Sequence, residues 1–167
     1  IPSNFKEGNA VIAAKDASET ILWSWHIWLT DKPKEQVYYN NAGTMMDRNL
    51  GATSATPGDA TSLGLLYQWG RKDPFLSFSD ISSTSIASST YEWPLEKELA
   101  TSIEYTINNP TTFIIGRYGN SFDWLYIPNW SQGTPPDATR WQSSKTIYDP
   151  CPSGWRVPDG GWDGIWY

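Results

Sequence analysis

The segment Ile21-Leu-Trp-Ser-Trp-His-Ile-Trp-Leu29 constrains the fold more than any other part of the chain. Its apolar residues recur with the period of a β-strand, and the odd-numbered positions Ile21, Trp23, Trp25, Ile27 and Leu29 are all apolar. A short apolar segment, residues 9–15, precedes it across the turn-forming run 16–20. The sequence therefore predicts a β-hairpin over 9–29, with the odd-numbered face of its second strand in the core.

Length and composition favour one folded domain, 1–167, rich in aromatic residues. The chain has 167 residues, of which 39% are hydrophobic and 15% aromatic, including eleven tryptophans. Its net charge is −6 and no run of Lys or Arg occurs, so we expect no nucleic-acid partner. No apolar stretch approaches the roughly 20 residues of a membrane-spanning helix, so we expect no transmembrane segment.

The rest of the chain mixes short strands with two short helices. We expect strands at 37–39, 44–50 and 111–115, a helix capped by Thr61 or Ser62 that runs to Trp69, and a second helix after Pro94 in which leucine and isoleucine recur every four residues. Residues 77–90 predict a long exposed loop, and residues 117–142 predict irregular backbone held by aromatic side chains. Together these features predict a small, irregular α+β domain with long aromatic loops.

Three motifs carry a resemblance to a known family. They are Met46-Asp-Arg-Asn-Leu-Gly51, Gly64-Leu-Leu-Tyr-Gln-Trp-Gly-Arg-Lys-Asp-Pro-Phe75 and Asp149-Pro-Cys-Pro-Ser-Gly-Trp-Arg-Val-Pro158. In this order they resemble the FISUMP-type domain of Bacteroidetes surface proteins, and sequences with similar Trp-Ser-Trp-His-Ile-Trp and Met-Asp-Arg-Asn-Leu-Gly-Ala segments occur in fimbrillin-family proteins. The resemblance covers roughly residues 9–160 and is weak between about 77 and 145.

The resemblance implies a location, a fold and a missing segment. It implies a secreted or cell-surface protein at the outer-membrane exterior, often a lipoprotein or a fimbrial component, with a C-type-lectin-like fold. Family members usually continue beyond the last motif and often end in a second cysteine that pairs with the first. Because this sequence ends at Tyr167 and has one cysteine, Cys151, we expect a fragment that lacks the C-terminal end of the family domain.

The predicted ligand site is a group of aromatic residues in loop-like sequence. Tyrosine and tryptophan rings stack on the apolar faces of sugars when they are exposed. The alternative is that most of these rings fill a small core. The candidate ligand-binding residues are Tyr118, Trp124, Tyr126, Trp130 and Trp141.

Four further residues are assigned structural roles. Trp69 and Trp155 lie in the family-like motifs between glycines and turn residues, and we expect both in the core. Arg48 lies in the set 47–49 and Asp73 in the set 71–73, and we expect the two sets to form ion pairs with each other across the edge of the core.

No pattern of catalytic or metal-binding residues stands out. His26, the single histidine, is interpreted as structural, and Cys151 between two prolines has no local histidine to activate it. Nothing selects a catalytic pair among the acids Asp47, Asp73, Glu92, Asp123 and Asp159. Asp159 and Asp163 in a glycine-rich run indicate turn chemistry rather than a calcium loop. The sequence predicts no catalytic residue, metal or cofactor.

These observations lead to three hypotheses about function. The first is a non-catalytic cell-surface or fimbrial module for adhesion, with a glycan or a host surface as its ligand. The second is a structural fimbrial or stalk subunit that pairs with neighbouring subunits by strand addition at 37–39. The third is a carbohydrate-active hydrolase, which requires two carboxylates, or His26 and a carboxylate, in one cleft.

Overall fold

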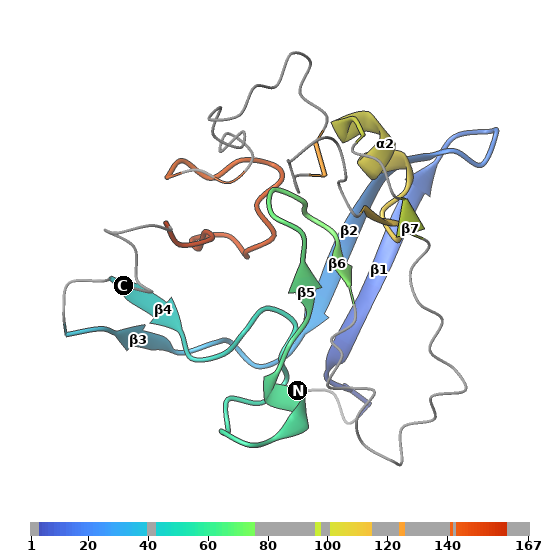
Figure 1. The fold of residues 1–167 in the computed structure, drawn as a ribbon. Helices are drawn as coiled ribbons and strands as arrows, with labels where there is room; N and C mark the ends of the chain where they lie inside the picture. The colour runs from blue at the N-terminus through green and yellow to red at the C-terminus, as the bar shows by residue number, and fades with distance from the viewer. Residues whose placement is uncertain are drawn as a thin grey trace.

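The computed structural model describes residues 4–39, 43–75, 96–97, 101–114, 124–125, 141 and 143–159. Within them the elements follow the order β1 (Gly8–Lys15), β2 (Ile21–Leu29), β3 (Glu35–Val37), β4 (Thr44–Met46), the 3₁₀ helix η1 (Ala60–Ser62), β5 (Leu66–Tyr67), β6 (Pro74–Phe75), β7 (Glu96–Lys97), α2 (Ile103–Asn108) and β8 (Phe113–Ile114) (Figure 1). The strands form four two-stranded sheets, β1–β2, β3–β4, β5–β6 and β7–β8, of which only the last is parallel. This mixture of short strands and one short α-helix in the described residues is a loose α+β arrangement, as predicted.

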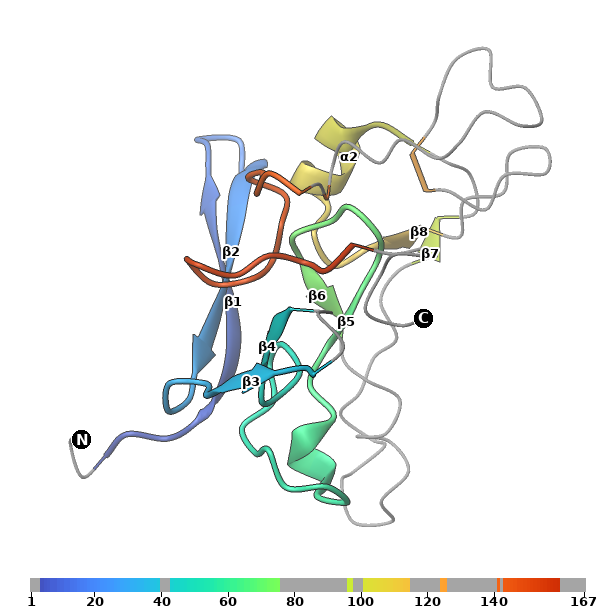
Figure 2. The same cartoon turned by 90° about the vertical axis from the view of Figure 1, so that its left-hand side faces the viewer.

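The predicted N-terminal hairpin is confirmed. β1 and β2 pair antiparallel from Gly8 opposite Leu29 to Lys15 opposite Ile21. The turn between them is organised by Asp16, whose carboxylate accepts hydrogen bonds from the backbone N–H groups of Ser18 and Thr20. Figure 2 shows this hairpin on the left, with β5, β6 and α2 to its right.

The prediction for the buried face of β2 holds for Ile21 and Trp23, which are half-buried on either side of the exposed Leu22, but it is wrong from Ser24 onward. The even-numbered face points into the molecule: Ser24 is fully buried and His26 is half-buried, while Trp25, Ile27 and Leu29 are exposed. The polar side chains are accepted inside because each has a partner there, described below. A β-bulge lies near the turn of the hairpin, where Leu22 has no opposite residue in β1. The bulge interrupts the regular alternation of inward and outward side chains along β2.

The predicted helix over 61–69 is also wrong. The chain forms only the one-turn η1, capped by Asp59 rather than by Thr61 or Ser62, and then extends into β5. Gly64 breaks the helical path because it adopts a φ of +71°, and its Cα lies close to the backbone of Leu50. β5 then turns back into β6, with Tyr67 opposite Pro74.

The second helix is shorter and later than predicted. Residues 96–97 are the strand β7, and α2 begins at Ile103, where the hydroxyl of Ser102 caps the helix by accepting from the N–H of Tyr105. The helix ends before Pro110, as expected. The strands predicted at 111–115 and 44–50 are confirmed as the shorter β8 and β4. The strand predicted at 37–39 overlaps β3 at Val37 alone, because β3 ends there. The predicted loop at 77–90 lies outside the described residues.

The described core is small and unusually polar. Its apolar members are Ala52, Phe75, Ile114 and Trp124. They share the interior with Ser24, Arg71, Asp73, Thr106, Thr112 and Asp149. Each buried polar group must therefore find a partner inside the fold, and these partnerships position the site. No helix within the described residues has the length and apolar character needed to cross a membrane.

Candidate functional site

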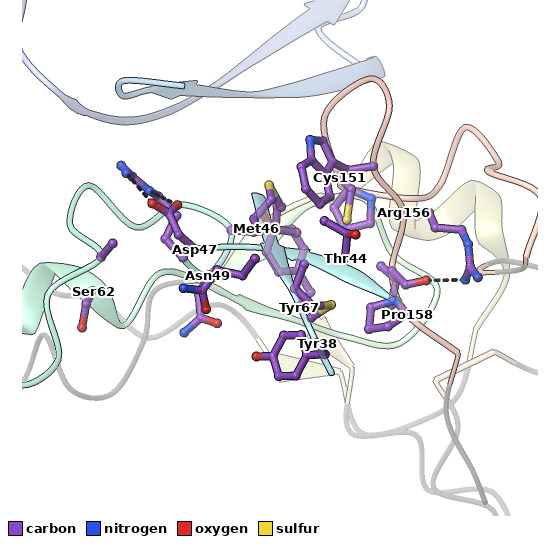
Figure 3. Close-up of a pocket in the computed structure, with 18 of the residues that line it drawn as sticks. Tyr38, Thr44, Met46, Asp47, Asn49, Ser62, Tyr67, Cys151, Arg156 and Pro158 are labelled. Carbon is purple, nitrogen blue, oxygen red and sulfur yellow. Dashed lines mark hydrogen bonds and ion pairs between the residues drawn. The ribbon is translucent and has the colours of Figure 1, made fainter. Parts of the chain in front are cut away.

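The three motif segments, distant in sequence, line one pocket. Its volume is about 590 Å³. The first segment contributes residues 46–50, the second contributes Tyr67, and the third contributes residues 150–151 and 155–158. Figure 3 shows Asp47 and Asn49 on one side of this pocket, Cys151, Arg156 and Pro158 on the other, and Tyr67 between them. The pocket is therefore built at the junction of the segments that carry the family resemblance.

The β3–β4 sheet contributes a further wall. Gln36 lies on β3 and Tyr38 directly follows it, while Thr44 and Met46 lie on β4, where the register pairs Val37 with Thr44. A hydrogen bond from the N–H of Tyr38 to the carbonyl of Gly43 continues the ladder beyond the strands. This pairing places the exposed ring of Tyr38 at the rim of the pocket (Figure 3).

Asp149 organises the wall formed by the third motif. Its buried carboxylate accepts hydrogen bonds from the N–H groups of Cys151 and Val157, at 2.9 Å each, and from Lys145 at 2.8 Å. Burial acts to raise the pKa of Asp149, but these three hydrogen bonds outweigh it and hold the pKa below its ordinary value. One ionised side chain thus ties both ends of the turn 150–157 and fixes where Trp155 and Cys151 meet the pocket.

Arg48 closes one end of the pocket through ion pairs. Its almost fully buried side chain binds Asp47 at 2.9 Å and Asp31 at 2.6 Å, and it also donates to the hydroxyl of Thr30. Hydrogen bonds from Arg48 lower the pKa of both carboxyl groups. Arg156 makes a corresponding pair with Asp159 at 2.6 Å. The pocket therefore has charged groups at its edges, each held by an opposite charge.

Tyr67 connects this pocket to His26. The hydroxyl of Tyr67 lies 3.0 Å from Nδ1 of His26, and Nε2 of His26 lies 2.9 Å from Oδ1 of Asn9. Because Asn9 uses its amide N–H₂ to donate to the carbonyl of Gly51, its Oδ1 accepts and His26 carries its proton on Nε2. Burial lowers the pKa of His26, so this neutral tautomer is the form the site favours. The histidine is thus held by a hydrogen bond at each ring nitrogen, and it lies beside a second pocket of about 210 Å³.

The predicted ion pairing between residues 47–49 and 71–73 is wrong. Arg48 pairs with Asp47 and Asp31, whereas Asp73 pairs with Lys72 at 2.8 Å and accepts from the hydroxyl of Ser24. In each set two adjacent residues pair with each other, Arg48 with Asp47 and Lys72 with Asp73. The remaining partners, Asp31 and Ser24, come from elsewhere in the chain. Arg48 and Asp73 both form ion pairs, but neither forms the predicted pair with the other set.

Arg71 binds the segment that follows α2 to the core. Its guanidinium donates to the carbonyls of Asn109, Pro110 and Thr112 and lies over the rings of Phe75 and Trp124. Burial lowers its pKa to about 10, which leaves it charged at neutral pH.

The structure separates the predicted ligand-binding aromatics. Trp124 is only 4% exposed and its indole N–H donates to the carbonyl of Trp69, so it is a core residue and cannot stack on a ligand. Trp141 does line the pocket, where it packs edge-on against Trp69. Tyr118, Tyr126 and Trp130 lie outside the described residues. Of the two predicted ligand residues that the structure describes, Trp141 is thus the one that lines the pocket.

The two tryptophans predicted to be core residues behave differently. Trp69 is 42% exposed, so its assignment to the core is wrong: its ring forms a surface pair with Trp141. Trp155 is half-buried and lines the pocket. Trp155 follows a turn that contains Gly154, whereas Trp69 precedes Gly70 in the turn between β5 and β6.

Sequence reasoning missed Tyr38, Tyr67 and Asn49 as pocket residues. The motifs contained the signal for the last two, because Tyr67 and Asn49 lie within them, but the motifs were interpreted as structural. Tyr38 carried no such signal, since it follows a short strand whose pairing alone decides which way it points.

Cys151 lines the pocket as a protonated thiol. Burial, with Asp149 nearby, raises its pKa to about 12. Within the described ranges, no group of three or more His, Cys, Asp or Glu side chains is arranged to hold a metal ion. Of the candidate acids, Glu92, Asp123 and Asp163 lie outside those ranges.

Comparison with known proteins gives no match: no family model, no curated protein and no solved structure is similar to this chain.

Proposed function

We propose that the chain is a non-catalytic cell-surface or fimbrial adhesion module that binds a glycan in the pocket of the three motifs. One observation carries the proposal: four aromatic side chains, Tyr38, Tyr67, Trp141 and Trp155, line a single pocket together with the amides of Gln36 and Asn49. Aromatic faces pack on the apolar faces of sugar rings, and amides bind sugar hydroxyls as both donors and acceptors. Ligand pockets of this size commonly combine apolar walls with a few polar groups.

Binding is favoured over hydrolysis by the state of the acids. Asp47 is the one carboxylate among the described residues that line the pocket, and Arg48 holds it in an ion pair. Glycosidases of the usual kind place two carboxyl groups on either side of the scissile bond. A hydrolase remains the third candidate, and it requires an acid to face Asp47 across the pocket.

Family and location belong to the same proposal. The convergence of the three motifs on one pocket supports membership of the FISUMP-type family, with its C-type-lectin-like fold and its location at the outer-membrane exterior. In that proposal the role of the three motifs is to build the pocket.

The experiment is a glycan-array screen of the purified chain with two matched variants, Tyr38→Ala and Tyr39→Ala. Tyr38 lines the pocket, whereas the neighbouring Tyr39 is 99% exposed and does not. We expect Tyr38→Ala to weaken binding about tenfold, or ~1.4 kcal/mol, and Tyr39→Ala to bind as the parent does. Equal binding by all three proteins, or no glycan bound by the folded parent, contradicts the proposal.

A structural assembly role is the second candidate, and a specific observation favours it. The strand predicted for strand addition, 37–39, shares only Val37 with the three-residue β3. The longer β1 offers a more extensive open edge, and its seven residues from Asn9 to Lys15 are all exposed.

A further inference from the structure

β1 has an open edge. It pairs with β2 on one side, and no strand of the described chain pairs with its other side. The opposite edge of the hairpin is different, because the carbonyl of Ser24 in β2 accepts a hydrogen bond from Lys72 and β2 packs against α2. Figure 2 shows the hairpin at the side of the described chain, away from β5 and β6. A two-stranded sheet of this kind gains stability when a further strand joins it.

The sequence of β1 does not protect this edge. Natural proteins use charged residues, prolines, bulges or very short strands to keep exposed edges from pairing with other strands. Residues 8–14 contain no charged residue and no proline, and the extra residue of the bulge belongs to β2. With eight residues, β1 is also longer than a typical strand, which has about five or six. Such a strand is a template for another strand.

We propose that β1 pairs antiparallel with β1 of a second copy of this chain, around a twofold axis at Val11. A twofold axis perpendicular to the sheet keeps paired residues on one face, so the axis must pass through a residue position. The axis at Val11 places Val11 opposite its own copy and Asn9 opposite Ala13 of the second copy.

Charge selects this register. With the axis at Val11, Glu7 lies opposite Lys15 of the second copy, and Lys6 lies opposite Asp16. Opposite charges facing each other across antiparallel strands stabilise the pairing. Moving the axis by one residue, to Ile12, places Lys15 opposite Asn9 and Glu7 opposite Ala17, so both charge pairs are lost. Lys15 currently binds Glu19 on the surface, an exposed pair that contributes little and can exchange.

The pairing joins two hairpins into a four-stranded sheet. In each copy the outward face carries Trp25, Ile27 and Leu29 of β2 beside Ala10 and Ile12 of β1, and Trp25 lies opposite Ile12. The joined sheet makes these two apolar faces continuous. This inference deepens the assembly candidate and does not depend on glycan binding, because Val11 does not line the pocket of the three motifs.

The first test measures the mass of the full chain in solution by sedimentation over a wide concentration range, with Val11→Lys and Val37→Lys as matched variants. Both valines lie on exposed strands, but only Val11 lies on the proposed axis. We expect the parent and Val37→Lys to dimerise and Val11→Lys to stay monomeric, since two lysines meet at the axis. A parent that is monomeric at every concentration, or a folded Val11→Lys variant that dimerises as the parent does, overturns the proposal.

The second test reads the register directly. Opposite residues of antiparallel strands lie about 4.5–5.5 Å apart, within reach of a disulfide, whereas Ala13 and its own copy are four residues apart, or roughly 13 Å. We expect Val11→Cys to form a covalent dimer under oxidation and Ala13→Cys to form none, although Asn9→Cys combined with Ala13→Cys restores it. The parent controls for Cys151. Crosslinking of Ala13→Cys as efficient as that of Val11→Cys rejects the register.

A charge exchange tests the ion pairs. Glu7→Lys places like charges opposite each other in both symmetric pairs, and we expect the dimer to weaken about tenfold. Adding Lys15→Glu restores opposite charges and the parent affinity. The glycan and dimer proposals can be contradicted independently of each other. Tyr38→Ala should lose glycan binding and still dimerise, whereas Val11→Lys should stay monomeric and still bind glycan.

Discussion

The ammonium group of Lys72 donates to both the carbonyl and the hydroxyl of Ser24, while its other contact is the carboxylate of Asp73 at 2.8 Å. Ser24 in turn donates its hydroxyl proton to Asp73. The three side chains form a closed network beneath β2, and the ammonium also lies 4.4 Å from the centre of the Trp23 ring. The charge of Lys72 is thus stabilised in the interior, because Ser24 and Asp73 accept its hydrogen bonds and the ring of Trp23 lies close to it.

Removing one member of this ion pair should be more damaging than removing both. Asp73→Asn leaves the Lys72 charge buried without its counter-charge, and we expect the free energy of unfolding to fall by ~3–5 kcal/mol. The double variant Asp73→Asn with Lys72→Met should recover part of that loss. Urea denaturation measures both, and Glu19→Gln, which removes an exposed ion pair with Lys15, serves as the control and should change stability little. A double variant less stable than Asp73→Asn contradicts this account.

His26 makes the protein less stable in acid. Burial lowers its pKa below the ordinary 6.5, with the charge of Asp73 acting weakly in the opposite direction. Between the folded and the unfolded pKa the unfolded chain binds more protons, so stability rises with pH across that window and falls as the pH drops through it. Each unit of difference corresponds to about 1.4 kcal/mol.

NMR titration can follow this group without ambiguity, because His26 is the single histidine of the chain. We expect a midpoint below 6.5 in the folded protein. Tyr67→Phe removes the hydroxyl that donates to Nδ1 and should move the midpoint upward, since that nitrogen becomes free to take a proton. A midpoint above the unfolded value contradicts the lowering of the pKa by burial.

Gly64 and Gly58 form a matched pair for testing the turn before β5. Both have positive φ, +71° and +85°, but a Cβ on Gly64 lies 2.5 Å from the carbonyl oxygen of Leu50, whereas a Cβ on Gly58 meets nothing within 4 Å. Gly58→Ala should therefore cost about 1–2 kcal/mol, from backbone strain alone. Gly64→Ala should cost clearly more and should also weaken ligand binding, because Leu50 lines the pocket. Equal thermal stability of the two variants contradicts the close approach.

The tryptophans should separate by burial. Trp124→Ala removes a core side chain and its hydrogen bond to the carbonyl of Trp69, so we expect a loss of ~3–5 kcal/mol. Trp69→Ala removes a ring that is nearly half exposed and should cost distinctly less. Thermal denaturation of the two variants gives the comparison, and a reversed order contradicts the burial of Trp124 and the exposure of Trp69.

The sequence predicted the hairpin, the short β8 strand and the α+β class, because turn residues and strand periodicity are local signals. It did not predict the inward face of β2, since apolar periodicity does not reveal that Ser24 and His26 find partners more than forty residues away. It also assigned a helix before Trp69, where the conformation of Gly64 overrides the local pattern. For the pocket, the motifs contained the right segments, but their convergence depends on contacts that no spacing rule encodes.

Arg71 has a consequence for how the chain is made. Its guanidinium donates to three carbonyls that lie 38 to 41 residues later in the sequence. On a ribosome that adds about 5–20 residues per second, the cation emerges roughly 2–8 s before its acceptors. The charged guanidinium of Arg71 is thus synthesised before the turn after α2 that it binds. The order of synthesis therefore sets the order in which these two parts of the core assemble.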